Sequence, residues 1–330
     1  MTAPDRPLRW GILGCARITR RGLIPGILGS TNSTLLAIAS RDGTTARAWA
    51  EEFAVPKAYG SYEQVIADPD VDAIYIPLPN ELHRGWTERA ADAGKHVLCE
   101  KPLSLDAAEA RAMVEHCRRR GVVLREAFMW RHQPRVAEIR RRVAEGAIGQ
   151  LRLIRSSFSF PIDMSDWRLD PSRGGGALWD VGTYGVNTAR LYAGAEPESI
   201  KATARLGPTG VDLSFVAAFG FPGGVLAAID CSFEQPFRCS YELVGSEGRI
   251  EVPDAYLPPD RPVARYYGPS GFAPGESEEW TFDGRDQYAC MVDAFAEAVA
   301  TGGAGGAPGE DGLAQMTALD AILASARSKT

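Results

Sequence analysis

Residues 8–19 read LRWGILGCARIT, an apolar run that ends at Gly14 and leads into a helix pattern from about Ile18. As a dinucleotide fingerprint, its three small positions are Gly14, Ala16 and Thr19. Small residues there allow a tight turn, close approach of the backbone to a pyrophosphate, and close packing of helix on strand. Only the first position is glycine, so the motif alone is weak. A strand before it and a helix after it favour nucleotide binding over a plain turn.

The phosphate of such a ligand lies at the N-terminus of the helix that follows the turn. We therefore predict that the residues from the turn into the helix contact a cofactor. They are Gly14, Cys15, Ala16, Arg17 and Ile18.

The first 127 residues alternate apolar runs with helix patterns. Strands are expected at 8–14, 34–40, 57–59, 72–78, 96–100 and 122–128. Helices are expected from 18, at 44–53, 61–68 and 81–94, and in a segment with Ser104 as N-cap that Gly121 ends. This alternation predicts right-handed βαβ units and a parallel sheet covered on both faces.

The pattern changes after residue 128. Strands are expected at 151–160, 199–206, 213–221, 224–233 and 240–252, and helices at 134–145, 178–192, 286–300 and 310–327. The Pro- and Gly-rich segment 253–277 is expected to be a loop. We predict an α+β domain with a largely antiparallel sheet, which divides the chain into domains 1–127 and 128–330.

Composition narrows the class of protein. The chain has 330 residues, 45% of them apolar, and a net charge of −6, so nucleic acid is not an expected partner. No apolar run is long enough to span a membrane, and no signal peptide is recognised, so we expect a cytoplasmic protein. The six cysteines form no C-x-x-C pair and are expected to be reduced. The four histidines lack metal-ligand spacing, so no metal site is expected, although a carboxylate-only site stays open.

The end of the second strand, Ser40-Arg41-Asp42, bears on the choice of cofactor. A hydroxyl and a guanidinium suit a ribose 2′-phosphate, which favours NADP(H). NAD(H) stays possible, because Asp42 would suit a ribose diol if the register shifts.

Two further segments follow expected strands. Open α/β sheets bind ligands at the carboxyl ends of their strands, so both segments are predicted to lie beside the cofactor. The fourth strand leads into IPLPNELH and the fifth into CEKP. Their predicted contacts are Pro77, Leu78, Asn80, His83, Glu100 and Lys101. A cis Lys101–Pro102 bond is possible.

The stretch 174–191, GGGALWDVGTYGVNTARL, is the second chemical motif. Asp180 and Tyr184 are four residues apart and share a helix face. Gly182 and Gly185 each cost roughly 1 kcal/mol relative to alanine, which suggests that something approaches this helix closely. With Lys101, Asp180 and Tyr184 form a possible proton-transfer set, because an ammonium favours the phenolate of a nearby tyrosine. A core helix with a satisfied Asp and a packed Tyr is the alternative.

Together these segments resemble the glucose–fructose oxidoreductase/inositol dehydrogenase (Gfo/Idh/MocA) family. The matching segments are RWGILG, AIASR, PKAYGSYEQVIADPDVDAIYIPLPNELH, AGKHVLCEKPLS, EAFMWRHQP and GGGALWDVGTY. The resemblance implies an N-terminal Rossmann domain and a C-terminal domain with an open-faced sheet that associates into a homodimer or homotetramer. It implies Lys101 as the catalytic lysine, Asp180 as the catalytic aspartate and Tyr184 as the acid–base residue. Arg131, Trp167 and Arg168 match positions that line the cofactor or substrate.

With tyrosine at position 184, the chain resembles most the subgroup of dihydrodiol dehydrogenase, NADP-dependent D-xylose dehydrogenase and nucleotide-sugar 3-ketoreductase. We therefore expect an NADP(H)-dependent oxidoreductase acting on a sugar or cyclic diol, specifically an aldose such as D-xylose or a dihydrodiol. A nucleotide-sugar 3-ketoreductase is the first alternative, and a non-catalytic NADP-sensing regulator is the second. Specificity is expected to depend on loops near 162–175 and 234–239.

Overall fold

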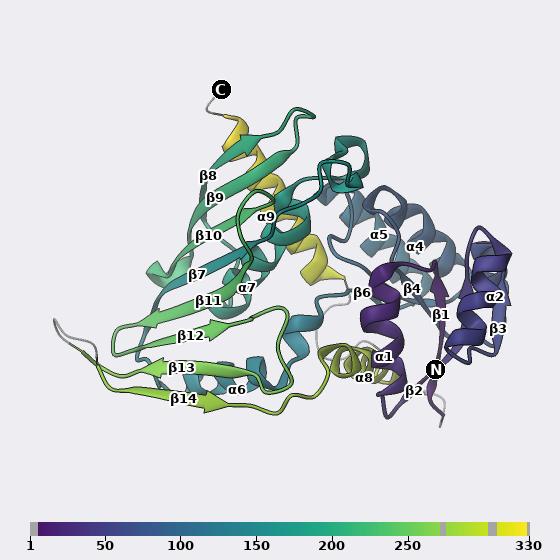
Figure 1. The fold of residues 1–330 in the computed structure, drawn as a ribbon, viewed down its shortest axis with the longest axis horizontal. Coiled ribbons are helices and arrows are strands. Elements are labelled where there is room, and N and C mark those ends of the chain that lie inside the picture. Colours follow the sequence, from purple (N-terminus) through teal and green to yellow (C-terminus); the bar gives the residue numbers. More distant parts are fainter. Residues whose placement is uncertain (1–5, 271–274, 303–308, 329–330) are drawn as a thin grey trace. The chain divides into compact units, whose positions relative to one another are not determined.

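The computed structural model describes residues 6–270, 275–302 and 309–328 of the chain (Figure 1). The chain divides into two compact units, which are described separately. Unit 1 comprises Met1–His132 and Asp286–Met316, and unit 2 comprises Gln133–Arg285 and Thr317–Thr330.

Unit 1 is built on a six-stranded sheet with the strand order β3-β2-β1-β4-β5-β6. The strands are β1 (Leu8–Leu13), β2 (Ser33–Ala39), β3 (Lys57–Tyr59), β4 (Ala73–Ile76), β5 (His96–Cys99) and β6 (Leu124–Glu126). Every pairing between these strands is parallel. The order reverses between β1 and β4, as in a Rossmann fold, where ligands bind at the carboxyl ends of these central strands. The predicted Rossmann architecture is confirmed.

The helices of unit 1 connect these strands. They are η1 (Thr19–Leu23), α1 (Ile24–Leu28), α2 (Gly43–Glu52), α3 (Tyr62–Ala67), η2 (Asn80–Leu82), α4 (His83–Asp92), α5 (Ala107–Arg120), η3 (Met129–His132) and α8 (Gln287–Ala300). Gly121 ends α5 with a φ of 70°, as predicted. The prediction that Ser104 caps α5 was wrong, because the Asp106 carboxylate accepts from Glu109 N at 2.8 Å and forms the cap.

Helix α8 packs against the first helix of unit 1. A Cβ at Gly22 would lie 2.4 Å from Tyr288 Cζ, and one at Gly26 would lie 2.6 Å from Tyr288 Cβ. The rings of Trp10 and Phe295 have centroids 5.0 Å apart. This packing groups 286–316 with unit 1, although those residues follow the second sheet in the chain. The prediction that residues 1–127 bind the cofactor and residues 128–330 bind the substrate stays a prediction.

Unit 2 contains an eight-stranded sheet in the order β14-β13-β12-β11-β7-β10-β9-β8. The strands are β7 (Leu151–Ser159), β8 (Ser199–Leu206), β9 (Asp212–Gly220), β10 (Leu226–Ser232), β11 (Arg238–Gly245), β12 (Arg249–Pro253), β13 (Val263–Tyr267) and β14 (Ser277–Thr281). β7 and β10 pair in parallel, and the other pairings between these strands are antiparallel. The predicted, mostly antiparallel sheet is confirmed.

The edge of this sheet was predicted wrongly in two places. The expected strand 240–252 is a hairpin of β11 and β12, because the chain turns at Ser246–Gly248. Strand β13 lies inside the segment expected to be a loop, of which 271–274 fall outside the described residues. The short segment VARYY is held as a strand by its pairing with β12 and β14. Prolines and glycines surround it in the sequence, so no local pattern predicts this strand.

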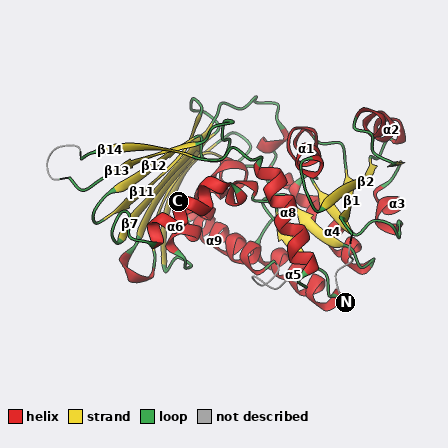
Figure 2. Cartoon of the chain, turned by 90° about the horizontal axis from the view of Figure 1, so that it is seen from below, coloured by secondary structure: helices red, strands yellow, loops and turns green. Residues whose placement is uncertain are grey.

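The helices of unit 2 are α6 (Pro134–Ala144), η4 (Trp167–Leu169), η5 (Pro171–Arg173), η6 (Leu178–Gly182), α7 (Thr183–Ala193), η7 (Pro222–Gly224) and the C-terminal part of α9 (Glu310–Arg327). Helix α7 packs on β7 and β10. Figure 2 shows α6 and this part of α9 on one side of the sheet, and no helix of the described part of unit 2 on the other. Val216 and Leu226 point outward there, with 60% and 55% of their surface exposed.

Candidate active site

The turn after β1 is shaped to receive a phosphate. Gly14 has a φ of 111°, a conformation that side chains disfavour. A Cβ on it would lie 3.3 Å from Leu78 Cδ2 and 3.4 Å from Tyr62 Oη. The chain becomes helical at Arg17 and passes through the π-helical turn η1. The first N–H groups of a helix lack partners within it and bind anions, so this turn fits the pyrophosphate of a dinucleotide.

In the turn after β2, the side chain of Asp42 is occupied by a helix cap. The Asp42 carboxylate caps α2 and accepts from Thr44 N at 2.9 Å and Thr45 Oγ1 at 2.8 Å. These hydrogen bonds, the one from Thr45 first, hold the pKa of Asp42 below its usual range. Because the carboxylate is committed to the cap, it is poorly placed to accept from a ribose diol. Ser40 Oγ accepts from Asp42 N at 3.2 Å.

Tyr62 connects Arg41 with the phosphate turn, and it is not among the predicted site residues. Burial raises the pKa of Tyr62, and the Arg41 guanidinium, which hydrogen-bonds its phenol, works in the opposite direction. The same phenol oxygen lies beside Gly14. A tyrosine opening a predicted helix is an ordinary core residue by pattern, so no sequence signal marked it.

His83 joins the loops that follow β4 and β5. It is fully buried, with Nδ1 2.9 Å from the Pro102 carbonyl oxygen and Nε2 2.8 Å from that of Leu78. Burial lowers its pKa, and those carbonyls oppose the shift. This position suits support of the loops better than direct contact with a cofactor. Pro77 and Asn80 are also buried in the first of these loops, and Leu78 is half-buried.

Buried Tyr75 fixes the side chain next to Lys101. Its phenol donates to Glu100 Oε1 at 2.5 Å, and the other oxygen, Oε2, accepts from Lys101 N at 3.3 Å. Burial raises the pKa of Tyr75 well above its ordinary value, and the Glu100 charge adds to this. The Lys101–Pro102 peptide is cis. Glu100 and Lys101 are both half-buried, at the end of the strand where they were predicted.

Arg131 forms an ion pair with Asp311 at the start of α9, within unit 1. The pair orients the guanidinium, and the predicted contact of Arg131 with a cofactor stays a prediction.

In unit 2, Asp180 is held by an arginine. Arg168 Nε lies 3.0 Å from Asp180 Oδ2, and Arg168 Nη1 lies 3.2 Å from Asp166 Oδ1. Burial alone would lower the pKa of Arg168, but the two carboxylates raise it above its usual range. The ring of Trp167 lies 5.0 Å from the Arg168 guanidinium. Arg168, predicted to line a ligand site, therefore orients the predicted catalytic aspartate.

Tyr184 is fixed by an aromatic cluster. It is 6% exposed, and its ring centroid lies 4.8 Å from that of Tyr256 and 5.5 Å from that of Phe158. Thr188 Oγ1 donates to the Tyr184 carbonyl at 2.8 Å and also lies 2.8 Å from Tyr256 Oη. Tyr256 Oη is in turn 2.7 Å from Ser156 Oγ. Both the backbone and the ring of Tyr184 are thus held in one orientation.

The two glycines of this helix allow it to lie directly on the sheet. A Cβ at Gly182 would be 2.8 Å from Cys231 Sγ, and one at Gly185 would be 3.3 Å from Ile229 and from Ser156 Oγ. The close approach expected from the sequence is therefore made by β7 and β10. Lys101 lies in unit 1 and the Asp180–Tyr184 pair in unit 2, and their joint action is a proposal.

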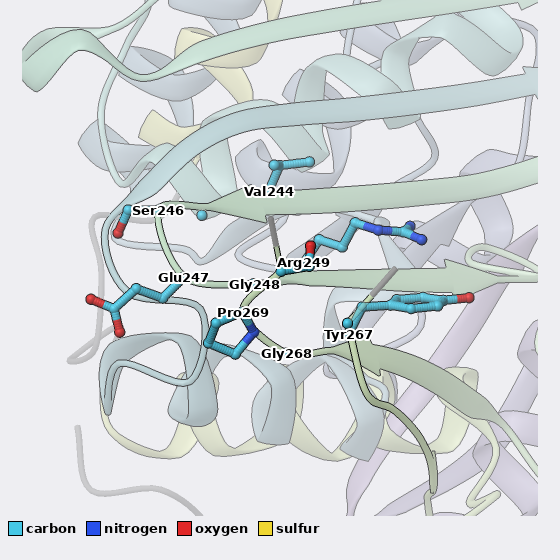
Figure 3. Close-up of a pocket in the computed structure, with 11 residues that line it drawn as sticks. Val244, Ser246, Glu247, Gly248, Arg249, Tyr267, Gly268 and Pro269 are labelled. Carbon is cyan, nitrogen blue, oxygen red and sulfur yellow. The ribbon is translucent and has the colours of Figure 1, made fainter. Parts of the chain in front are cut away.

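Two hollows of unit 2 contain none of the predicted site residues. One, of about 270 Å³, lies at the turn between β11 and β12 and the end of β13, where Figure 3 shows Arg249 beside the ring of Tyr267. The other, of about 410 Å³, lies on the open face across β7, β9 and β10. Among the described residues, no cluster of His, Cys, Asp or Glu could hold a metal ion, and no helix is long and apolar enough to cross a membrane.

A parallel sheet of this order, with a phosphate-binding turn after β1, defines a dinucleotide-binding protein. The chain belongs to the Gfo/Idh/MocA oxidoreductase family. Residues 8–128 match the family model described as an oxidoreductase family with an NAD-binding Rossmann fold, and residues 136–251 match the GFO/IDH/MocA C-terminal domain.

Similar proteins fall within the predicted subgroup. The chain is 39% identical over 324 residues to a D-xylose 1-dehydrogenase (NADP(+)) of Haloferax volcanii, covering 97% of this chain and 98% of the relative. It is 40% identical over 309 residues to a dTDP-3,4-didehydro-2,6-dideoxy-α-D-glucose 3-reductase of Streptomyces violaceoruber, covering 92% and 89%. The crystal structure of a 3-ketoreductase from Actinomadura kijaniata in complex with NADP and TDP-benzene superposes with a TM-score of 0.89 at 34% identity, covering 97% and 98% of the chains.

Proposed function

We propose that the protein is an NADP(H)-dependent oxidoreductase that interconverts an alcohol and a carbonyl on a sugar or cyclic diol. The proposed substrate is an aldose such as D-xylose, or a dihydrodiol. The observation that carries the proposal is the fixed pair on one helix, in which Arg168 orients Asp180 and an aromatic cluster orients Tyr184. A phenol and a carboxylate held in this way, in a chain of this family, suit proton transfer to a bound hydroxyl.

When bound, the nicotinamide accepts or supplies the hydride. In the direction of oxidation, Tyr184 as phenolate takes the proton as the substrate O–H bond breaks, the C=O bond forms and the C–H bond of the same carbon breaks to release the hydride. In reduction, the phenol returns that proton to the oxygen. Lys101 polarises the substrate oxygen and favours the phenolate, and Asp180 orients the substrate hydroxyl.

Cofactor binding is assigned to unit 1. The backbone of Gly14, Cys15, Ala16, Arg17 and Ile18 would hold the pyrophosphate. Ser40 and Arg41 would bind the ribose 2′-phosphate, which supports NADP(H) over NAD(H). The rest of the cofactor is proposed to lie along Pro77, Leu78, Asn80, Glu100 and Arg131. The substrate is proposed to lie near Trp167.

Arg41→Ala is expected to raise the Kd for NADPH by about 10-fold or more and to leave the Kd for NADH within about twofold, because a 2′-phosphate loses its charge-assisted partner. Fluorescence titration measures both constants. Arg47→Ala removes an exposed arginine from α2 and serves as the control. Equal weakening for both dinucleotides would contradict the assignment of Arg41 to the 2′-phosphate.

A substrate panel separates this function from its alternatives. Free aldoses and dihydrodiols with NADP⁺ are expected to give turnover, measured as NADPH formation. Turnover only of nucleotide-linked keto sugars with NADPH would favour the 3-ketoreductase alternative, which the likeness to the Actinomadura structure supports. NADPH binding with no turnover of any substrate, together with stable association with a transcription factor, would favour the regulator.

We also propose that two or four copies of the chain associate through the open face of the unit 2 sheet, where Val216 and Leu226 are exposed. Light scattering coupled to gel filtration is expected to give the mass of a dimer or tetramer. Val216→Glu is expected to lower that mass, because association through this face would then bury the charge of the new side chain. Leu28→Glu, at an apolar position of unit 1 that is 65% exposed, is the control, and an equal effect of both would contradict the assignment of this face.

A further inference from the structure

A buried carboxylate lies at the start of the helix that carries Asp180 and Tyr184. Asp212, the first residue of β9, is 5% exposed, and its Oδ2 accepts a hydrogen bond from Leu178 N at 2.6 Å. The N–H of Ala177 is a further donor. All of these residues belong to unit 2.

The glycines before this helix make room for the carboxylate. Gly176 has a φ of 130°, and a Cβ on it would lie 2.3 Å from Asp212 Oδ1. Any side chain at Gly176 would therefore displace Asp212 or the turn. The third glycine of the Gly174–Gly176 run is explained by this contact, which no pattern in the sequence indicated.

The donors to Asp212 are backbone groups at a helix N-terminus, where the helix dipole also favours negative charge. Burial raises the pKa of Asp212 to about 6, and the N–H groups of Leu178, Asp212 and Ala177 work against that shift. Cys231 on β10 is within electrostatic range of both Asp212 and Asp180. An ionised carboxylate in this place exchanges its hydration for the helix N–H groups and so ties β9 to the helix.

The same helix is fixed further along by its contact with the sheet at Gly182 and Gly185. Its start at Leu178 precedes Tyr184 by only the residues of η6 and the first residue of α7. A rotation or fraying at the start would therefore move Asp180 first, and then the orientation of the Tyr184 phenol.

We propose that Asp212 is a positioning residue for the reaction: by holding the first N–H groups of the helix, it keeps Asp180 and Tyr184 in their productive orientation. The inference rests on the proposed function, because it assigns Asp180 and Tyr184 their roles. Asp212 itself is not a catalytic residue, since it acts through the backbone of the helix.

Asp212→Ala and Asp212→Asn test this inference. Asp212→Ala is expected to lower kcat for the panel substrate by about 10-fold or more, with the Kd for NADPH within twofold. Asp212→Asn keeps an acceptor oxygen for Leu178 N and is expected to recover most of kcat. Asp286→Ala is the matched control, because Asp286 caps α8 through Ala289 N at 2.8 Å and its loss affects a different helix. It is expected to lower Tm and leave kcat within about twofold.

Hydrogen–deuterium exchange of the amides at 177–184 provides a readout that is independent of turnover. Exchange there is expected to be faster in Asp212→Ala than in the wild type, and unchanged in Asp286→Ala. Unaltered exchange, or a kcat of Asp212→Ala equal to that of the wild type, would overturn the inference. If Asp212→Ala does not fold, the exchange of Asp212→Asn decides: it is expected to be faster than in the wild type at 177–184, because a neutral amide oxygen accepts from Leu178 N more weakly than a carboxylate does, and unaltered exchange would overturn the inference. A wild type without turnover on any panel substrate would refute the proposed function instead, and exchange alone would then show whether Asp212 holds the helix.

Discussion

Tyr184→Phe is expected to lower kcat by about 10²-fold or more and to leave the Kd for NADPH within about twofold. The substitution removes one oxygen and keeps the ring that packs against Tyr256 and Phe158. A loss of this size is at the lower end of acid–base contributions and corresponds to about 2.7 kcal/mol in the activation barrier. Steady-state kinetics with the panel substrate and fluorescence titration with NADPH measure the two effects.

Tyr192→Phe is the matched control for this prediction. Tyr192 lies on the same helix, and its phenol oxygen is 2.7 Å from Tyr241 Oη. Its loss removes a partly buried hydrogen bond and is expected to reduce stability by about 1 kcal/mol with kcat nearly unchanged. If Tyr184→Phe kept more than half of the wild-type kcat, Tyr184 would not be the acid–base residue. A matching loss of kcat in Tyr192→Phe would point to a general effect of helix packing.

The sheet of unit 1 could be predicted because its information is local. The strands expected at 8–14, 72–78 and 96–100 each contain an apolar run, which is typical of a sheet buried on both faces. The end of α5 at Gly121 was predicted from the sequence, whereas its cap was predicted at Ser104 and lies at Asp106. Strand β13 could not be predicted, because its local sequence is typical of a loop and only its pairing with β12 and β14 makes it a strand.

The site residues divide along the same physical line. Gly14, Lys101 and Tyr184 were predicted because they end strands or share a helix face, which spacing alone reveals, and their roles stay predictions. Tyr62, Tyr75 and Asp212 were missed, since each acts on a residue far from it in sequence. Asp212 is 34 positions from Leu178, and nothing local distinguishes it from any aspartate that begins a strand.

His83 and Arg168 show the converse. Their positions in the sequence motifs indicated contact with a ligand, which stays a prediction, and the structure adds that His83 connects two loops and Arg168 holds Asp180. A motif identifies the neighbourhood of a site, while burial and hydrogen-bond partners decide which members face a ligand and which support those that do.

Lys101→Met is expected to lower kcat by about 10²-fold or more, because methionine has a similar length but no charge to polarise the substrate oxygen. The pH at which oxidation reaches its maximum rate is expected to rise, since without the ammonium the phenolate of Tyr184 is less favoured. Lys101→Arg is expected to recover little, because a planar guanidinium cannot replace a compact ammonium. Lys201→Met, at an exposed lysine of β8, is the control.

The double variant Lys101→Met/Tyr184→Phe tests whether these two residues act on the same step. Groups that act as a unit give losses far smaller than the product of the single losses, whereas independent groups give losses that multiply. We expect the kcat of the double variant to lie within about 10-fold of the kcat of the less active single variant. Losses that multiply to about 10⁴-fold would show that the lysine of unit 1 and the tyrosine of unit 2 contribute separately, and the proposed proton transfer would then lack its cation.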